Sequence, residues 1–182
     1  MAWLRSIIAA SFWPNSDLNR AIAVDPKNAT FYLFRAFIKS ELGQNEAAII
    51  DLNQAISIDP KLADAYSNRG EIKLKLQQKQ AALDDVNLAV AVAPRSGNAY
   101  VSRCRVRLVL KQTKEAINDC QRAVELDPKN PIGYLTLGFA KVESGDKPGG
   151  IIDLTKAAEI YRSMNVIDFY QSIMAIIQKL KE

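Results

Sequence analysis

The fold is decided by residues 60–94, which read PKLADAYSNRGEIKLKLQQKQAALDDVNLAVAVAP. This stretch begins at one proline and ends at another proline 34 residues later. The same pattern returns every 34 residues. It is marked by a proline, a tyrosine and an alanine, at Pro26, Pro60, Pro94 and Pro128, at Tyr32, Tyr66, Tyr100 and Tyr134, and at Ala55, Ala89, Ala123 and Ala157. Such self-similarity indicates helix-turn-helix repeats, in which each unit buries its apolar face by stacking on its neighbours. The sequence therefore predicts an all-α solenoid of antiparallel helix pairs.

Each repeat is expected to contain two helices that approach closely. On the first helix a small residue follows the tyrosine by four positions, as in Tyr66 and Gly70, so both lie on one face. On the second helix the small side chains of Ala82 and Ala89 leave room for the partner helix. The predicted organisation is an irregular N-terminal segment with a partial repeat at 1–28, four repeats at 29–62, 63–96, 97–130 and 131–164, and a capping helix at 165–182.

The turns within the repeats are marked less regularly than the helices. Gly43 and Gly145 mark the turn in the first and fourth repeats, because glycine readily takes the left-handed conformation that ends a helix. Gln77 and Lys111 replace this glycine in the middle repeats. Proline marks the turns between repeats, since it cannot continue the preceding helix.

Composition excludes several classes of protein. The chain has 182 residues with a hydrophobic fraction of 48% and a net charge of +4. No uninterrupted apolar run approaches the length that spans a bilayer, so no transmembrane helix is expected. The absence of histidine removes imidazole bases and histidine metal sites. We therefore expect no enzyme, no cofactor, no metal site and no small-molecule substrate.

The two cysteines, Cys104 and Cys120, lie in one repeat, at places that are small or apolar in the other repeats. Free cysteine is among the most buried residue types and packs as a small hydrophobic side chain. The favoured interpretation is a pair of buried reduced thiols. A disulfide or a reactive site is the alternative.

Charged residues follow the same period as the packing residues. The predicted ladder consists of Arg35, Arg69 and Arg103 on the first helices and Asp51, Asp85 and Asp119 on the second. Each arginine has a second cation four residues later, and two such cations repel each other unless an acid lies between them. We therefore predict an arginine–aspartate contact inside each repeat, and a structural role for the ladder. In the fourth repeat Leu137 replaces the arginine, so Lys141 alone would face Asp153.

A basic stripe that binds nucleic acid is the alternative interpretation of this ladder. The acids keep pace with the bases and the net charge is only +4, so no nucleic-acid partner is expected.

With these features the chain resembles the tetratricopeptide repeat family, in the form common in prokaryotes. Tyr66, Gly70, Ala82, Ala89 and Pro94 match the family pattern of an aromatic residue, a small residue, two alanines and a terminal proline. The resemblance covers nearly the whole chain and implies a right-handed superhelical solenoid. It departs at the missing tryptophan, at 147–150 and at 162, where a proline is expected. Family members are mostly noncatalytic peptide-binding or assembly scaffolds, which is the function expected here.

The resemblance also implies a concave groove lined by the first helices, with a protein or peptide as its ligand. Carried onto this chain, the candidate groove residues are Leu33, Phe37, Asp64, Ser67, Glu71, Asn98, Val101, Arg105, Leu135 and Phe139. Both ends of this set are apolar and its middle is charged, which suits a peptide with apolar anchors and an acidic side chain that meets Arg105. The alternative is that Leu33, Phe37 and Phe139 are partly buried by neighbouring helices.

One subset of the family holds the C-terminal carboxylate of chaperone tails with two lysines, two asparagines and an arginine. Here Leu33 and Phe37 stand at the first lysine and asparagine, and Asn98 and Ser102 replace the other lysine and the arginine. Asn68 alone matches the clamp. Binding of chaperone tails is therefore not expected.

The N-terminal residues 3–13 contain one basic residue and a short apolar run. They are interpreted as a truncated first repeat, because residues 17–26 align with residues 51–60, the second helix of a repeat. A secretory signal or a membrane anchor is the alternative. The expected location is cytoplasmic, and an exported or membrane-peripheral assembly protein is the second functional hypothesis.

Residues 165–181 form an amphipathic pattern with an apolar face made by Val166, Phe169, Tyr170, Ile173, Ile177 and Leu180. A helix of this kind is expected to cap the exposed end of the solenoid. Ile167, Met174 and Ile176 widen the apolar arc, so a homodimer contact is a second use for this helix.

Overall fold

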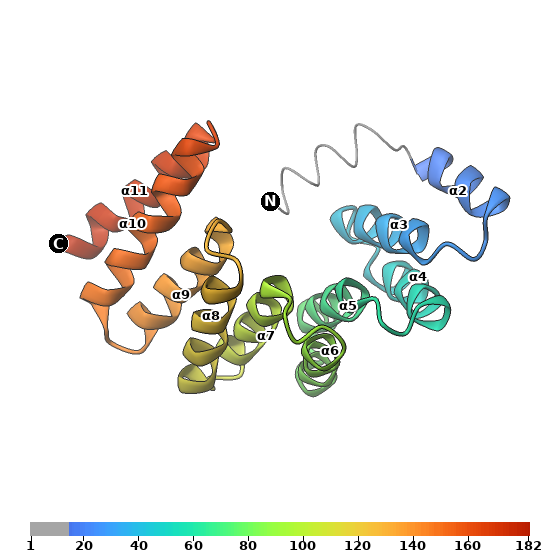
Figure 1. The fold of residues 1–182 in the computed structure, drawn as a ribbon, viewed down its shortest axis with the longest axis horizontal. Coiled ribbons are helices and arrows are strands. Elements are labelled where there is room, and N and C mark those ends of the chain that lie inside the picture. The colour runs from blue at the N-terminus through green and yellow to red at the C-terminus, as the bar shows by residue number, and fades with distance from the viewer. Residues whose placement is uncertain (1–14) are drawn as a thin grey trace. The chain divides into compact units, whose positions relative to one another are not determined.

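The computed structural model describes residues 15–182, and every regular element in that range is an α-helix (Figure 1). The helices are α2 (Asn15–Val24), α3 (Ala29–Glu41), α4 (Asn45–Ile58), α5 (Ala63–Lys75), α6 (Lys79–Val92), α7 (Gly97–Val109), α8 (Thr113–Leu126), α9 (Pro131–Glu143), α10 (Lys147–Ser163) and α11 (Ile167–Lys181). This confirms the prediction of an all-α protein built from helix pairs. The predictions for residues 3–13 lie outside the described residues. Within 15–182, no helix is both long and apolar enough to cross a bilayer.

The chain divides into two compact units, and the first ends at Pro94. In this unit α2 packs on α3, α3 pairs with α4, and α5 pairs with α6. Small side chains make these pairs close, since Ala36, Ala48 and Ala55 are completely buried. Leu33 and Leu52 join them in a core that extends to α5. The apolar face of each pair is thus covered by the next, as repeat stacking requires.

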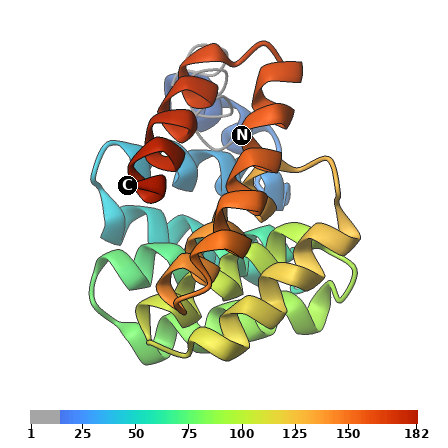
Figure 2. The same ribbon diagram turned by 90° about the vertical axis from the view of Figure 1, so that its left-hand side faces the viewer.

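The second unit begins at Arg95 and contains the pairs α7/α8 and α9/α10, followed by α11. Figures 1 and 2 both show α11 alongside α10. Ile173 and Ile177 of α11 are buried in a core with Leu154 and Tyr161 of α10. The predicted terminal helix therefore exists and covers α10.

The turns inside the repeats have one conformation whether or not they contain glycine. Gly43 and Gly145 have φ of 75° and 93°, and Gln77 and Lys111 adopt the same left-handed region at 62° and 61°. The substitution of glycine in the middle repeats thus leaves the turn unchanged. It places a side chain in a backbone region that favours glycine.

The last second helix is longer than its equivalents. Helix α10 has 17 residues, whereas α4, α6 and α8 have 14 each. Those three end before a proline, but Arg162 stands at that place in α10, and arginine continues a helix. The helix ends instead at Ser163, and Asn165 takes a left-handed φ of 58°.

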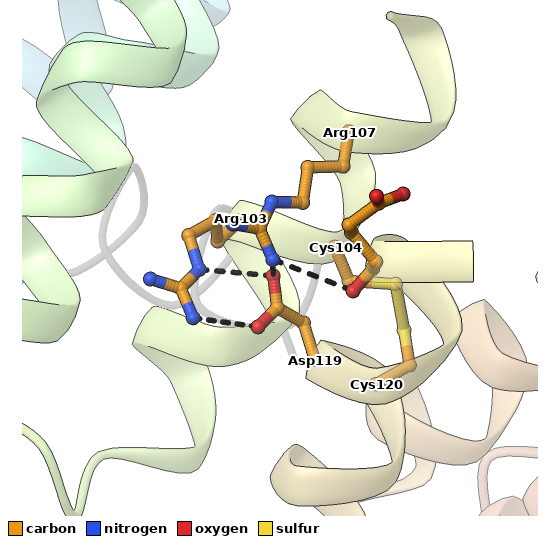
Figure 3. Close-up of polar contacts among 6 residues, drawn as sticks. Arg103, Cys104, Arg107, Asp119 and Cys120 are labelled. Atoms are coloured by element: carbon orange, nitrogen blue, oxygen red, sulfur yellow. Dashed lines mark hydrogen bonds and ion pairs between the residues drawn. A yellow bond between two sulfur atoms is a disulfide. The ribbon is translucent and has the colours of Figure 1, made fainter. Parts of the chain in front are cut away.

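The prediction of reduced thiols is wrong, because Cys104 and Cys120 form a disulfide between α7 and α8 (Figure 3). Both residues are completely buried. Their Cα atoms are 5.6 Å apart, which suits a disulfide. The equivalent pairs explain this closeness: a Cβ built on Gly70 would lie 2.8 Å from Val86, and one on Gly138 would lie 2.7 Å from Leu154.

Candidate functional site

The structure divides the candidate groove residues into buried and accessible sets. Leu33, Ser67 and Val101 are 8%, 5% and 5% exposed, so they do not form an open surface. They occupy equivalent positions in three successive repeats. Leu33 belongs to the core that joins α3 and α5, which shows that this position packs against a neighbouring first helix. The assignment of these three residues to an open groove is therefore corrected.

In the first unit the accessible candidates are Phe37, Asp64 and Glu71. Asp64 is exposed, and Phe37 and Glu71 are half-buried. At the ends of the same two helices, Lys75 Nζ donates a hydrogen bond to Ser40 Oγ at 3.3 Å. Phe34, which the sequence analysis did not select, is 47% exposed one turn before Phe37.

In the second unit Asn98, Arg105 and Phe139 are exposed, and Leu135 is half-buried. Leu135 packs against the core formed by α10 and α11. Asn98 Oδ1 accepts a hydrogen bond from Asn130 Nδ2 at 3.0 Å. Phe139 is 41% exposed and lies on α9 at the position that Arg105 occupies on α7. The accessible candidates of this unit thus include an aromatic ring and a guanidinium on neighbouring first helices.

The predicted arginine–aspartate contacts are present in all three repeats that carry the arginine. The distance from the arginine Nη2 to the aspartate Oδ1 is 2.6 Å in each of the pairs Arg35–Asp51, Arg69–Asp85 and Arg103–Asp119. Each arginine also donates from Nε to the second carboxylate oxygen, so the pairs are bidentate. The aspartates are at most 4% exposed.

A second cation completes each site. In the third repeat Arg107 Nη1 lies 2.6 Å from Asp119 Oδ2, the oxygen that also accepts a hydrogen bond from Arg103 Nε (Figure 3). Lys39 and Lys73 occupy this place in the first two repeats, at 2.7 and 2.8 Å. One buried carboxylate therefore pairs with two cations, and lies between them as the sequence predicted.

The guanidinium groups also stack on the repeated tyrosines. The carbon at the centre of each guanidinium lies 5.3–5.6 Å from a ring centroid, in the pairs Arg35–Tyr32, Arg69–Tyr66 and Arg103–Tyr100. The hydrogen bond to Asp51 raises the pKa of Arg35 above its ordinary value, against the opposing effect of burial. These three guanidinium groups are permanently charged, and each is already paired with an aspartate and stacked on a tyrosine ring.

Sequence analysis missed the asparagines that extend the ladder from one repeat to the next. Arg35 Nη1 donates to Asn19 Oδ1 at 2.8 Å, and Arg69 Nη1 donates to Asn53 Oδ1 at 2.6 Å. Each asparagine lies on the second helix that precedes its arginine. Their common spacing of 34 residues was the available signal. In the first unit the ladder thus stabilises both the repeats and their stacking.

The fourth repeat keeps only part of this arrangement. Lys141 Nζ lies 2.7 Å from Asp153 Oδ2, as predicted. Leu137 is buried against the disulfide of the preceding repeat. No group of three or more acids, cysteines or histidines in residues 15–182 could hold a metal ion.

Comparisons with known proteins agree with the repeat pattern. A family model described as TPR repeat matches residues 38–77, and one described as tetratricopeptide repeat matches residues 108–130. No curated protein matches the chain. Among solved structures, TTC0263, a thermophilic TPR protein of Thermus thermophilus, is 16% identical with a TM-score of 0.80, over 96% of this chain and 100% of its own.

Two further solved structures have a peptide-binding site or a bound peptide. YrrB, a TPR protein with an unusual peptide-binding site, is 19% identical with a TM-score of 0.61, over 90% of this chain and 91% of its own. The first TPR of Spaghetti (RPAP3), bound to the HSP90 peptide SRMEEVD, is 26% identical with a TM-score of 0.59, over 66% of this chain and 96% of its own. With the repeated sequence pattern and the paired helices of each unit, the two family-model matches and these solved structures support a tetratricopeptide repeat protein.

Proposed function

We propose that this protein is a noncatalytic scaffold that binds a segment of a partner protein on the exposed residues of its first helices. Members of the family are typically noncatalytic, and the tetratricopeptide fold supports a role in protein interaction. YrrB has an unusual peptide-binding site, and the first TPR of Spaghetti is bound to an HSP90 peptide.

The observation that carries the proposal is a pairing of an aromatic and a charged side chain in each unit. Phe37 on α3 and Glu71 on α5 occupy equivalent positions in the first unit. In the second unit Arg105 on α7 and Phe139 on α9 occupy the same position of the repeat. A half-exposed phenylalanine offers an apolar anchor, and a neighbouring charge fixes the orientation of a bound segment.

The test is affinity capture from native lysate with identification by mass spectrometry. Wild type is compared with a variant that carries Phe37→Asp, Arg105→Glu and Phe139→Asp. The matched control carries Ile50→Asp and Leu88→Asp, which change exposed apolar residues of the second helices. Circular dichroism must show that all three proteins remain helical.

The proposal expects a partner that wild type and the control capture but the first-helix variant does not. Purified partner should then show the same order of affinities in a direct titration. Equal capture by all three proteins would refute the assignment of these residues. Loss of the partner only in the control would place binding on the second helices.

We further propose an oxidising compartment for this protein, which favours the hypothesis of an exported or membrane-peripheral assembly protein over a cytoplasmic one. The supporting observation is the completely buried disulfide between Cys104 and Cys120, because structural disulfides are rare in the cytosol. The test is acid trapping of native cells followed by thiol alkylation and mass spectrometry. A fully reduced pair in the trapped sample would contradict this location.

A further inference from the structure

The first three repeats show how this fold binds a guanidinium. In each, an aspartate on the second helix pairs with the guanidinium through both oxygens, and a tyrosine ring lies beneath it. Figure 3 shows the paired groups of the third repeat, Arg103 and Asp119. The guanidinium in every case comes from the first helix of the same repeat.

The fourth repeat keeps the receiving groups without the guanidinium. Tyr134 and Asp153 occupy the places of Tyr100 and Asp119. Leu137 stands where the arginine would be, and its side chain is 3% exposed in the core with Cys104 and Cys120. The aspartate and the ring therefore have no guanidinium from their own repeat.

Asp153 is the most accessible aspartate of the ladder. Its side chain is 12% exposed, compared with 3–5% for the other three. Among residues 15–182, Lys141 is the one cation paired with it, whereas each of the others pairs with two. One side of this carboxylate thus remains available to a further donor.

An open-sided hollow of about 480 Å³ lies at these residues, a volume within the range of ligand sites. It is bounded by Tyr134 of α9 and by Ile152, Asp153 and Thr155 of α10. Lys156 and Glu159 form its exposed rim. The lining is mostly apolar, so it suits an aliphatic stem that ends in a group able to pair with Asp153.

We propose that this hollow binds an arginine side chain of a partner protein, in the place that the chain's own arginines occupy in the other repeats. Arginine is specified over lysine because its planar fork pairs with a carboxylate through two hydrogen bonds and stacks on a ring. The inference rests on the proposed function only in taking a protein as the partner. It uses neither Arg105 nor Phe139.

The probe is Nα-acetyl-arginine amide, titrated into the full chain and followed by amide chemical shifts in NMR spectra. Nα-acetyl-lysine amide is the matched probe of equal charge. Millimolar affinity is expected for a lone side chain. Shifts should saturate at Tyr134, Asp153 and Thr155, and the lysine probe should bind at least about fivefold more weakly.

Two variants test whether the hollow is the site. Leu137→Arg should supply the guanidinium internally, as at the equivalent Arg69 and Arg103, and weaken binding of the probe by about tenfold or more. Asp153→Asn keeps the shape but removes the charge, and should weaken binding by about fivefold or more. Asp153→Asn alone decides the matter if Leu137→Arg does not fold.

The control is Phe139→Asp, which should bind the arginine probe as wild type does even if it loses the captured partner. If partner capture does not depend on the first-helix residues, binding of the arginine probe in the hollow can still be observed. If the probe does not bind, partner capture by the first-helix residues can still be observed. No saturable shifts, equal binding of the lysine probe, or undiminished binding by Asp153→Asn would each overturn the inference.

Discussion

Replacing Asp85 with alanine tests whether the charge ladder is structural. Asp85 is 2% exposed and contacts Arg69 at 2.6 Å and Lys73 at 2.8 Å. The side chains of these two cations are only 16% and 20% exposed. In the variant a methyl group replaces the carboxylate. Both positive charges would therefore lose their acidic partner and repel each other across one helical turn.

The expected cost follows from burial. Removing one partner of a buried ion pair typically destabilises a protein by about 3–5 kcal/mol. Arg69 and Lys73 can regain part of their hydration, because long side chains on the surface reorient at little cost. We therefore expect Asp85→Ala to lower the free energy of unfolding by about 2–4 kcal/mol.

The assay is urea unfolding followed by circular dichroism, with equal slopes required before midpoints are compared. The control is Asp84→Ala, which removes an exposed aspartate next in the chain and should cost less than about 0.5 kcal/mol. Replacing Asp85, Arg69 and Lys73 together with apolar residues should recover much of the loss, because no unpaired charge remains. If Asp85→Ala and Asp84→Ala unfold at the same midpoint, the structural interpretation is refuted.

Three further predictions concern the turns, the disulfide and a buried phenol. Gln77→Gly should stabilise by about 0.5–1 kcal/mol, because φ is 62° there, and Gln78→Gly at φ of −83° should destabilise in the same urea assay. Reduction of Cys104–Cys120 should lower the free energy of unfolding by up to about 3 kcal/mol, and a variant with alanine at both positions should not respond to reductant. Burial raises the pKa of Tyr161 above 10.0, so this phenol keeps its proton to a higher pH in the folded state than in the unfolded state. The free energy of unfolding should be constant below that pH and fall as the pH rises through it. Tyr161→Phe should reduce this fall, which is checked by urea midpoints measured below and above that pH.

Features that recur within the chain could be predicted, because the two helices of each repeat pack against each other in the same way. Tyr66, Gly70 and Ala89 indicate where helices meet, and the arginines and aspartates recur at fixed spacing. The contact of Arg69 with Asp85 needed only the assumption that the helix pair folds about its turn.

Accessibility could not be predicted in the same way, since it depends on which neighbour covers a position. Leu33 and Phe37 lie on the same helix face, yet Leu33 packs into the core with α5 while Phe37 stays half-buried. The disulfide was missed for a related reason. Its signal was geometric, because Cys104 and Cys120 occupy the closest approach of two helices, the place where Gly70 meets Val86.

The fourth repeat separates two roles of the charge ladder. Its arginine position is Leu137, and the preceding asparagine position is Gln121, so both members of the hydrogen bond between repeats differ. Asp153 is retained, because Lys141 still requires a counter-charge at 2.7 Å. The bond between repeats and the neutralisation within a repeat are therefore independent, and loss of the first leaves a carboxylate and the ring of Tyr134 open to a guanidinium from another molecule.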